Sequence, residues 1–110
     1  MIINRLQESI QIKQAILESE EIRDAIQTAA RVCVDAYRNK KKVLLCGNGG
    51  SAADAQHIAA ELSGKFYYDR PPLDAEALHV NTSYLTAVAN DYSYDEIFSR
   101  MVRARGNEGD

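Results

Sequence analysis

The middle of the chain contains a glycine-rich turn with polar side chains that could bind a ligand. The turn holds Gly47, Gly49 and Gly50, with Asn48 among them. Glycine lets a backbone come close to a ligand, and the helix expected to start near Ser51 would offer free N–H groups and the positive end of its dipole. The Ser51 hydroxyl and the Asn48 amide would add hydrogen bonds. We therefore expect the ligand to be a phosphorylated or polyhydroxylated small molecule.

Two side chains capable of proton transfer or metal binding, His57 and Glu61, follow on the same expected helix. Because they are four residues apart, they share a helix face beyond the glycine-rich turn. The pair suits a metal site or an acid–base pair beside a bound ligand. A solvent-facing pair without a function is the alternative, and zinc would need two or more further ligands. These two residues by themselves leave the choice open.

Three further roles compete for the glycine-rich turn. A P-loop is excluded, because no Gly-Lys-Ser/Thr follows the glycines. Residues 47–52 satisfy the dinucleotide pattern G-x-G-x-x-A, but Asn81 and Thr82 stand where an acidic residue is needed, which disfavours a nicotinamide-dependent dehydrogenase. Capping of the helix by Ser51, paired with Asp54, would account for those two residues without any ligand. It does not account for the glycines.

The hydrophobic pattern predicts an α/β fold around this segment. Helices are expected over residues 2–18, 20–38, 51–62, 83–89 and 93–104, and strands over 42–46 and 77–80. A helix between two strands indicates a βαβ unit with a parallel sheet. Since two short strands make a poor sheet, we expect further strands to lie outside these residues or to come from a partner.

Charge and composition exclude several classes of protein. The net charge of −3 over 110 residues gives no electrostatic footprint for nucleic acid. No apolar run is long enough for a membrane span, and polar residues come too early for a signal peptide. Cys33 and Cys46 lie in different expected elements without zinc-type spacing. We expect reduced thiols in a cytoplasmic protein.

The combined pattern closely resembles the start of the sugar isomerase (SIS) domain of bacterial phosphoheptose isomerases. The resemblance is carried by Cys46–Ser51, Asp54, His57, Glu61–Phe66, Arg70–Pro72 and Asn90–Ser99. It implies a SIS-type three-layer α/β sandwich with a parallel sheet, of which only the N-terminal helices and the first βαβ part are present. We expect one incomplete SIS domain over 1–110, with a helical hairpin over 1–40 and the first part of the α/β core over 41–110.

The same resemblance implies a reaction. Such enzymes convert sedoheptulose 7-phosphate to D-glycero-D-manno-heptose 7-phosphate, a step in ADP/GDP-heptose biosynthesis for lipopolysaccharide or capsule. Ketose–aldose interconversion through an enediol needs a base that moves a proton between C1 and C2. The alternative is a non-catalytic SIS protein that binds phosphosugars or protein partners. The presence of both His57 and Glu61 favours the enzyme.

Roles for individual residues also follow from the resemblance. Glu61 matches the general base and a substrate contact, and His57 and Glu61 match two zinc ligands. The other implied substrate contacts are Asn48, Gly49, Gly50, Ser51, Asn90 and Asp91. The remaining zinc ligands, the acid and the main phosphate loop match nothing in this chain, so we expect it to be catalytically incomplete alone. The family also implies a cytoplasmic homotetramer, built on a bundle of the N-terminal helices.

Overall fold

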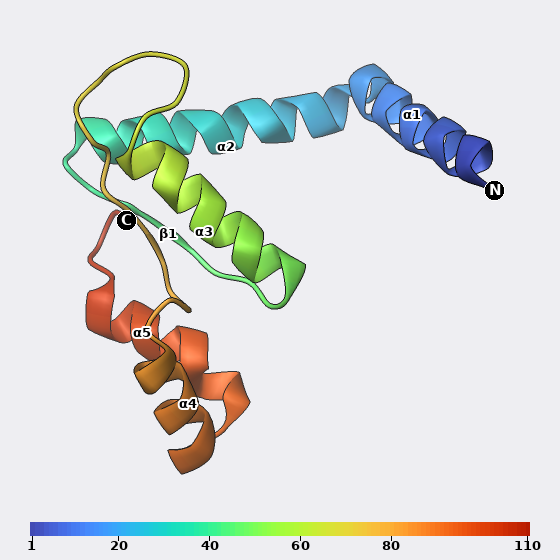
Figure 1. The fold of residues 1–110 in the computed structure, drawn as a ribbon. Helices are drawn as coiled ribbons and strands as arrows, with labels where there is room; N and C mark the ends of the chain where they lie inside the picture. The colour runs from blue at the N-terminus through green and yellow to red at the C-terminus, as the bar shows by residue number, and fades with distance from the viewer. The chain divides into compact units, whose positions relative to one another are not determined.

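Helices dominate the structure, a computed structural model that describes residues 1–110 (Figure 1). The elements in chain order are α1 (Ile2–Glu18), α2 (Glu20–Arg38), β1 (Val43–Leu45), α3 (Gly50–Ser63), β2 (Ala75–Ala77), α4 (Thr82–Asp91), the 3-10 helix η1 (Tyr94–Glu96) and α5 (Ile97–Arg105). The chain forms two units, Met1–Val34 and Asp35–Asp110. The domain division expected at residue 40 stays a prediction. None of the helices combines the length and apolarity that a membrane span requires.

The first unit consists of α1 and most of α2, with bounds that match the predicted helices. Ser19 is the single extended residue between them, and its Oγ accepts a hydrogen bond from the Ile22 N–H at 3.3 Å. This contact caps the start of α2. No residue of either helix is buried, and Leu6 and Ile10 are 60% and 66% exposed. The apolar side chains of this unit therefore lack a cover within the chain.

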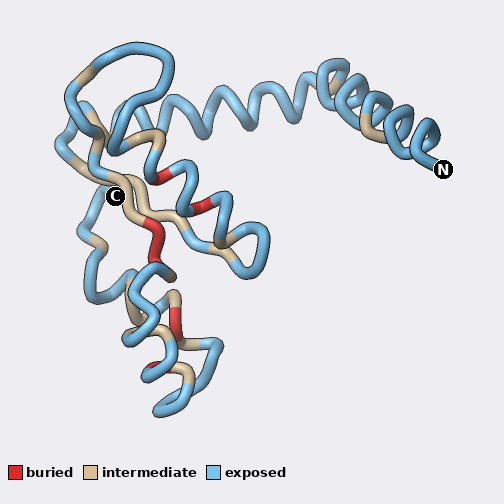
Figure 2. The backbone as a smooth tube through the Cα atoms, in the orientation of Figure 1, coloured by how far each residue is buried: buried red, intermediate tan, exposed pale blue.

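In the second unit, β1 and β2 form a parallel pair, which confirms the predicted α/β arrangement. Val43 pairs with Ala75, and Leu45 pairs with Ala77. Helix α3 packs on the strands through Ala55 and Ala59, which are buried together with Ala77 (Figure 2). Because alanine has the smallest apolar side chain, this face of α3 lies close to the sheet. The opposite face is exposed and carries His57, whereas Ser51, four residues before Ala55, lies on the same side of the helix as the buried alanines.

The second strand, Ala75–Ala77, begins two residues and ends three residues before the predicted range of 77–80. The Leu78 N–H still donates to the Leu45 carbonyl at 2.8 Å, but the chain turns at Leu78 and His79. Leu78 is only 2% exposed. Leu78 is therefore apolar because it is buried in the turn after β2. It does not extend the pairing of the two strands.

Helices α4 and α5 enclose a second small core around Ile97, which is 1% exposed. The Tyr84 hydroxyl of α4 donates to the Ile97 carbonyl at 2.7 Å. At the start of α4, Asn81 Oδ1 accepts a hydrogen bond from the Tyr84 N–H at 3.0 Å, which caps the helix. Two helices are present here, as expected, but the one predicted over 93–104 begins with the 3-10 turn η1 and becomes α-helical only at Ile97.

Candidate functional site

The three glycines of the turn between β1 and α3 have different physical requirements. A Cβ on Gly47 would lie 2.7 Å from the Ser51 backbone, so only glycine lets the turn pack against the first turn of α3. Gly49 has a φ of +56°, in the region that favours glycine. A Cβ on Gly50 would meet nothing within 4 Å. The fold thus explains Gly47 and Gly49 but leaves Gly50 without a structural reason.

Capping of α3 by Ser51, paired with Asp54, is wrong. The N-cap is Gly49, and no side chain makes a capping hydrogen bond. Since Gly49 adopts a positive φ, the helix begins at Gly50 and Ser51 becomes its second residue. The Ser51 side chain is exposed and its hydroxyl has no hydrogen-bond partner in the chain. The Ser51 hydroxyl is therefore free to contact a ligand.

The free backbone donors of the turn differ from those expected. The Ser51 N–H donates to the Asn48 carbonyl at 3.0 Å, and the N–H groups of Ala52 and Ala53 donate to the Gly49 carbonyl at 3.1 and 3.3 Å. The N–H groups of Gly49 and Gly50 have no acceptor in the chain. An anion or a hydroxyl oxygen would therefore be bound by these two glycines, at the positive end of the α3 dipole.

Asn48 connects the turn to a distant segment. Its Oδ1 accepts a hydrogen bond from the Tyr94 hydroxyl of η1 at 2.5 Å. Asn90 and Asp91, at the end of α4, are exposed and are joined to each other at 3.2 Å, but no hydrogen bond joins them to the turn. Sequence reasoning missed Tyr94, whose only signal was its place in the segment that resembles the SIS domain.

His57 and Glu61 meet on one face of α3, as their spacing predicts. His57 Nε2 lies 3.4 Å from Glu61 Oε1, and the two side chains are 76% and 35% exposed. They border a cavity of about 340 Å³, lined by His57, Ile58, Glu61, Leu62, Phe66 and Arg70. The pair therefore stands at the edge of a partly apolar hollow that a small molecule could enter.

Arg70 holds the end of α3 that carries Glu61. Its guanidinium donates to the carbonyl oxygens of Glu61 at 2.9 Å and Leu62 at 2.8 Å. These carbonyls belong to the last turn of the helix, where they lack intrahelical partners and favour a nearby positive charge. Arg70 thus fixes the backbone beneath Glu61. Nothing in the sequence indicates this contact beyond the resemblance of the Arg70–Pro72 stretch.

The His57–Glu61 pair has the spacing of two zinc ligands. Two ligands at about 2.1 Å from a tetrahedral zinc lie about 3.4 Å apart, and the Nε2–Oε1 distance is 3.4 Å. Imidazole nitrogen and carboxylate oxygen are both zinc ligands. No group of three or more His, Cys, Asp or Glu side chains converges in the structure. The pair fits two corners of a zinc site, and the chain offers no third.

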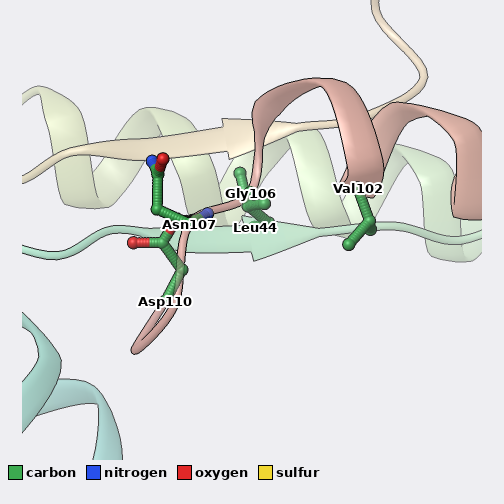
Figure 3. A pocket seen from close by; sticks show the side chains of 5 residues that line it. All are labelled: Leu44, Val102, Gly106, Asn107 and Asp110. Carbon is green, nitrogen blue, oxygen red and sulfur yellow. Dashed lines mark hydrogen bonds between the residues drawn. The ribbon is translucent and has the colours of Figure 1, made fainter.

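A second cavity, of about 410 Å³, lies between β1 and the segment that follows α5 (Figure 3). Its lining residues are Leu44, Val102, Gly106, Asn107 and Asp110. At its rim, the Asp110 carboxylate accepts hydrogen bonds from the N–H groups of Asn107 at 2.8 Å and Lys42 at 3.1 Å. None of the predicted site residues lines this cavity.

Comparison with known proteins points to one family. The chain is 51% identical over 107 residues to a phosphoheptose isomerase of Aneurinibacillus thermoaerophilus and 54% identical over 106 residues to one of Clostridium acetobutylicum. These matches cover 97% and 96% of the chain and 54% of each relative. The chain thus spans about half the length of the curated relatives it matches.

Solved structures give the same result. The phosphoheptose isomerase GmhA of Neisseria gonorrhoeae superposes with a TM-score of 0.85 and 44% identity, over 99% of this chain and 55% of that one. The phosphoheptose isomerase of Francisella tularensis gives 0.90 and 40%, over 97% and 55%. The sequence model of the SIS domain matches residues 6–110. With these matches, and with the predicted parallel βαβ unit in place, the chain belongs to the SIS domain family.

Proposed function

We propose that this chain forms the N-terminal part of a phosphosugar isomerase that converts sedoheptulose 7-phosphate to D-glycero-D-manno-heptose 7-phosphate. The observation that carries the proposal is the His57–Glu61 pair at 3.4 Å, on the helix that follows a turn with two free glycine N–H groups. The relatives named phosphoheptose isomerase, at about half identity, support the same reaction. The product would serve heptose biosynthesis for lipopolysaccharide or capsule.

The proposed chemistry assigns a separate task to each end of α3. The Glu61 carboxylate removes a proton from C1 of the ketose, giving an enediolate, and returns it to C2, while an acid from outside this chain protonates O2 and the O1 proton is released to form the aldehyde. The Gly49 and Gly50 N–H groups, together with Asn48 and Ser51, hold oxygen atoms of the sugar phosphate. Ten residues separate Ser51 from Glu61, or about 15 Å along the helix axis. A substrate that contacts both residues must therefore bind in an extended form.

Zinc is the proposed metal, with His57 and Glu61 as two of its ligands. When bound, such an ion would stabilise negative charge that develops on the sugar oxygens. Two or more further ligands must come from outside this chain, since it supplies only two. The roles of Asn90 and Asp91 as substrate contacts, the homotetramer and the cytoplasmic location remain part of the same proposal.

Incubating the full-length gene product with sedoheptulose 7-phosphate and following the anomeric proton of the aldose by NMR tests this function. The proposal expects conversion to the heptose 7-phosphate, which stops when the protein is treated with a strong zinc chelator. Binding of the ketose without conversion would favour the alternative, a non-catalytic SIS protein. Absence of both binding and conversion would exclude this substrate.

A further inference from the structure

We propose that Tyr94 is a positioning residue for substrate binding, which acts by fixing the orientation of the Asn48 side-chain amide. This inference rests on the proposed function, because it takes Asn48 as a sugar-phosphate contact. The Tyr94 hydroxyl donates a hydrogen bond to Asn48 Oδ1 at 2.5 Å, across 46 residues of sequence. It is the one side-chain hydrogen bond made by the glycine-rich turn, residues 47–50.

The scaffold behind Tyr94 places its hydroxyl firmly. Tyr94 opens η1, and its carbonyl accepts a hydrogen bond from the Ile97 N–H. Ile97 is 1% exposed, and its own carbonyl accepts from the Tyr84 hydroxyl at 2.7 Å. The base of Tyr94 is therefore tied to the buried core of α4 and α5. Asn48 lies in an exposed turn and makes no comparable contact with a core. The hydrogen bond from Tyr94 therefore restrains the orientation of the Asn48 side chain.

Occupation of Asn48 Oδ1 determines what the amide can recognise. An asparagine side chain has one acceptor oxygen and two N–H donors. With Tyr94 donating to the oxygen, the Nδ2 group is the part that remains for a ligand. Beside it are the free N–H groups of Gly49 and Gly50. The amide and the two backbone groups then present donors to a ligand, which suits the oxygen atoms of a phosphate or the lone pairs of a sugar hydroxyl.

Loss of the hydroxyl should weaken binding without weakening the fold. Both partners are exposed, and Tyr94 is 52% exposed, so no buried polar group is left unsatisfied in Tyr94→Phe. Without the Tyr94 hydroxyl, the Asn48 amide can rotate so that Oδ1 faces the ligand. The repulsion between Oδ1 and the ligand oxygens would then weaken binding. A net hydrogen bond of ordinary strength corresponds to about a three- to tenfold weaker affinity.

Tyr92→Phe is the matched control. It removes the same atom from a neighbouring tyrosine whose hydroxyl makes no hydrogen bond, and it keeps the ring that the Arg100 guanidinium covers at 4.2 Å. Affinity for sedoheptulose 7-phosphate would be measured by calorimetry on the full-length gene product. The set comprises the wild type, Tyr92→Phe, Tyr94→Phe, Asn48→Ala and the Asn48→Ala/Tyr94→Phe double variant.

The inference expects weaker binding in Tyr94→Phe, wild-type binding in Tyr92→Phe, and no further loss when Tyr94→Phe is added to Asn48→Ala. Melting temperatures should agree within error for the two phenylalanine variants and the wild type. The inference would be overturned if Tyr94→Phe lowered the affinity equally in the wild type and in Asn48→Ala. Wild-type affinity in Tyr94→Phe, with or without a lowered melting temperature, would also overturn it. A wild-type protein that does not bind the sugar phosphate would instead overturn the proposed function, and this inference with it.

Discussion

Replacement of Gly50 by alanine separates ligand binding from folding more cleanly than any other change in the turn. The added Cβ would meet nothing within 4 Å, and the backbone of Gly50 does not need a positive φ. Gly50 is also the first residue of α3. Alanine therefore fits the fold without strain, and the only thing it changes is the space in front of the Gly50 N–H.

The expected effects on stability and on binding differ in sign. Alanine is favoured over glycine inside a helix by up to about 1 kcal/mol, so Gly50→Ala should leave the free energy of unfolding unchanged or raise it by less than this. In the proposed complex, the same methyl group would lie in the space through which the ligand approaches the free N–H. A hydrogen bond from an N–H group to a charged oxygen contributes about 1.5–3 kcal/mol. Its loss would weaken the binding of a sugar phosphate by about 10- to 150-fold.

Calorimetric titration with sedoheptulose 7-phosphate and thermal melting of the same samples provide the two readouts. Gly47→Ala is the control with the opposite result: its Cβ would lie 2.7 Å from backbone atoms of Ser51, so the fold should lose about 1–3 kcal/mol. Wild-type affinity in Gly50→Ala would show that the ligand binds without approaching this part of the turn, and the proposed role of the Gly50 N–H would be wrong.

Ser51, Asp110 and the N-terminal helices give three more tests. Ser51→Ala should weaken sugar-phosphate binding and leave the melting temperature unchanged, since Ser51 does not cap α3; a lower melting temperature with unchanged affinity would contradict this. Hydrogen bonds from the Asn107 and Lys42 N–H groups, with the Lys42 charge, hold the pKa of Asp110 below its ordinary value of 3.8 against the opposing effect of desolvation. Asp110→Asn should therefore lower stability at neutral pH, where the folded state favours the ionised carboxylate, and the difference should vanish in urea melts as the pH falls through the lowered pKa. Light scattering of the full-length gene product should give a tetramer, because α1 and α2 bury no residue; a monodisperse monomer would rule this out.

Local signals in the sequence predict several elements well. The bounds of α1 and α2 follow from hydrophobic periodicity. The start of α3 is predicted within one residue, because β1 ends just before a run of glycines. The pairing of His57 with Glu61 also follows from helical spacing alone.

The errors have local physical causes. The position of β2 depends on its pairing with β1, in which the Val43 N–H donates to the Asp74 carbonyl, and no local pattern encodes that register. Serine is a common N-cap, which favours Ser51 as the cap of α3, but glycine at position 49 can take the positive φ that starts the helix earlier. Only the glycine backbone distinguishes the two arrangements.

Contacts between distant segments could not be predicted. Tyr94 reaches Asn48 across 46 residues, and Arg70 reaches the Glu61 carbonyl across nine. Neither contact has a spacing that a helix or a strand would produce. Both depend on where the loops after α3 and α4 return to the sheet, which is a property of the folded chain and not of any short segment.

Turnover of sedoheptulose 7-phosphate by Glu61→Gln tests most directly whether Glu61 is the base. Glutamine keeps the shape of the side chain and one acceptor oxygen but cannot accept the C1 proton at neutral pH. The full-length variant should bind the ketose with near wild-type affinity, and NMR should detect no aldose over a period in which the wild type reaches equilibrium. Aldose formation at the wild-type rate would remove Glu61 from the mechanism.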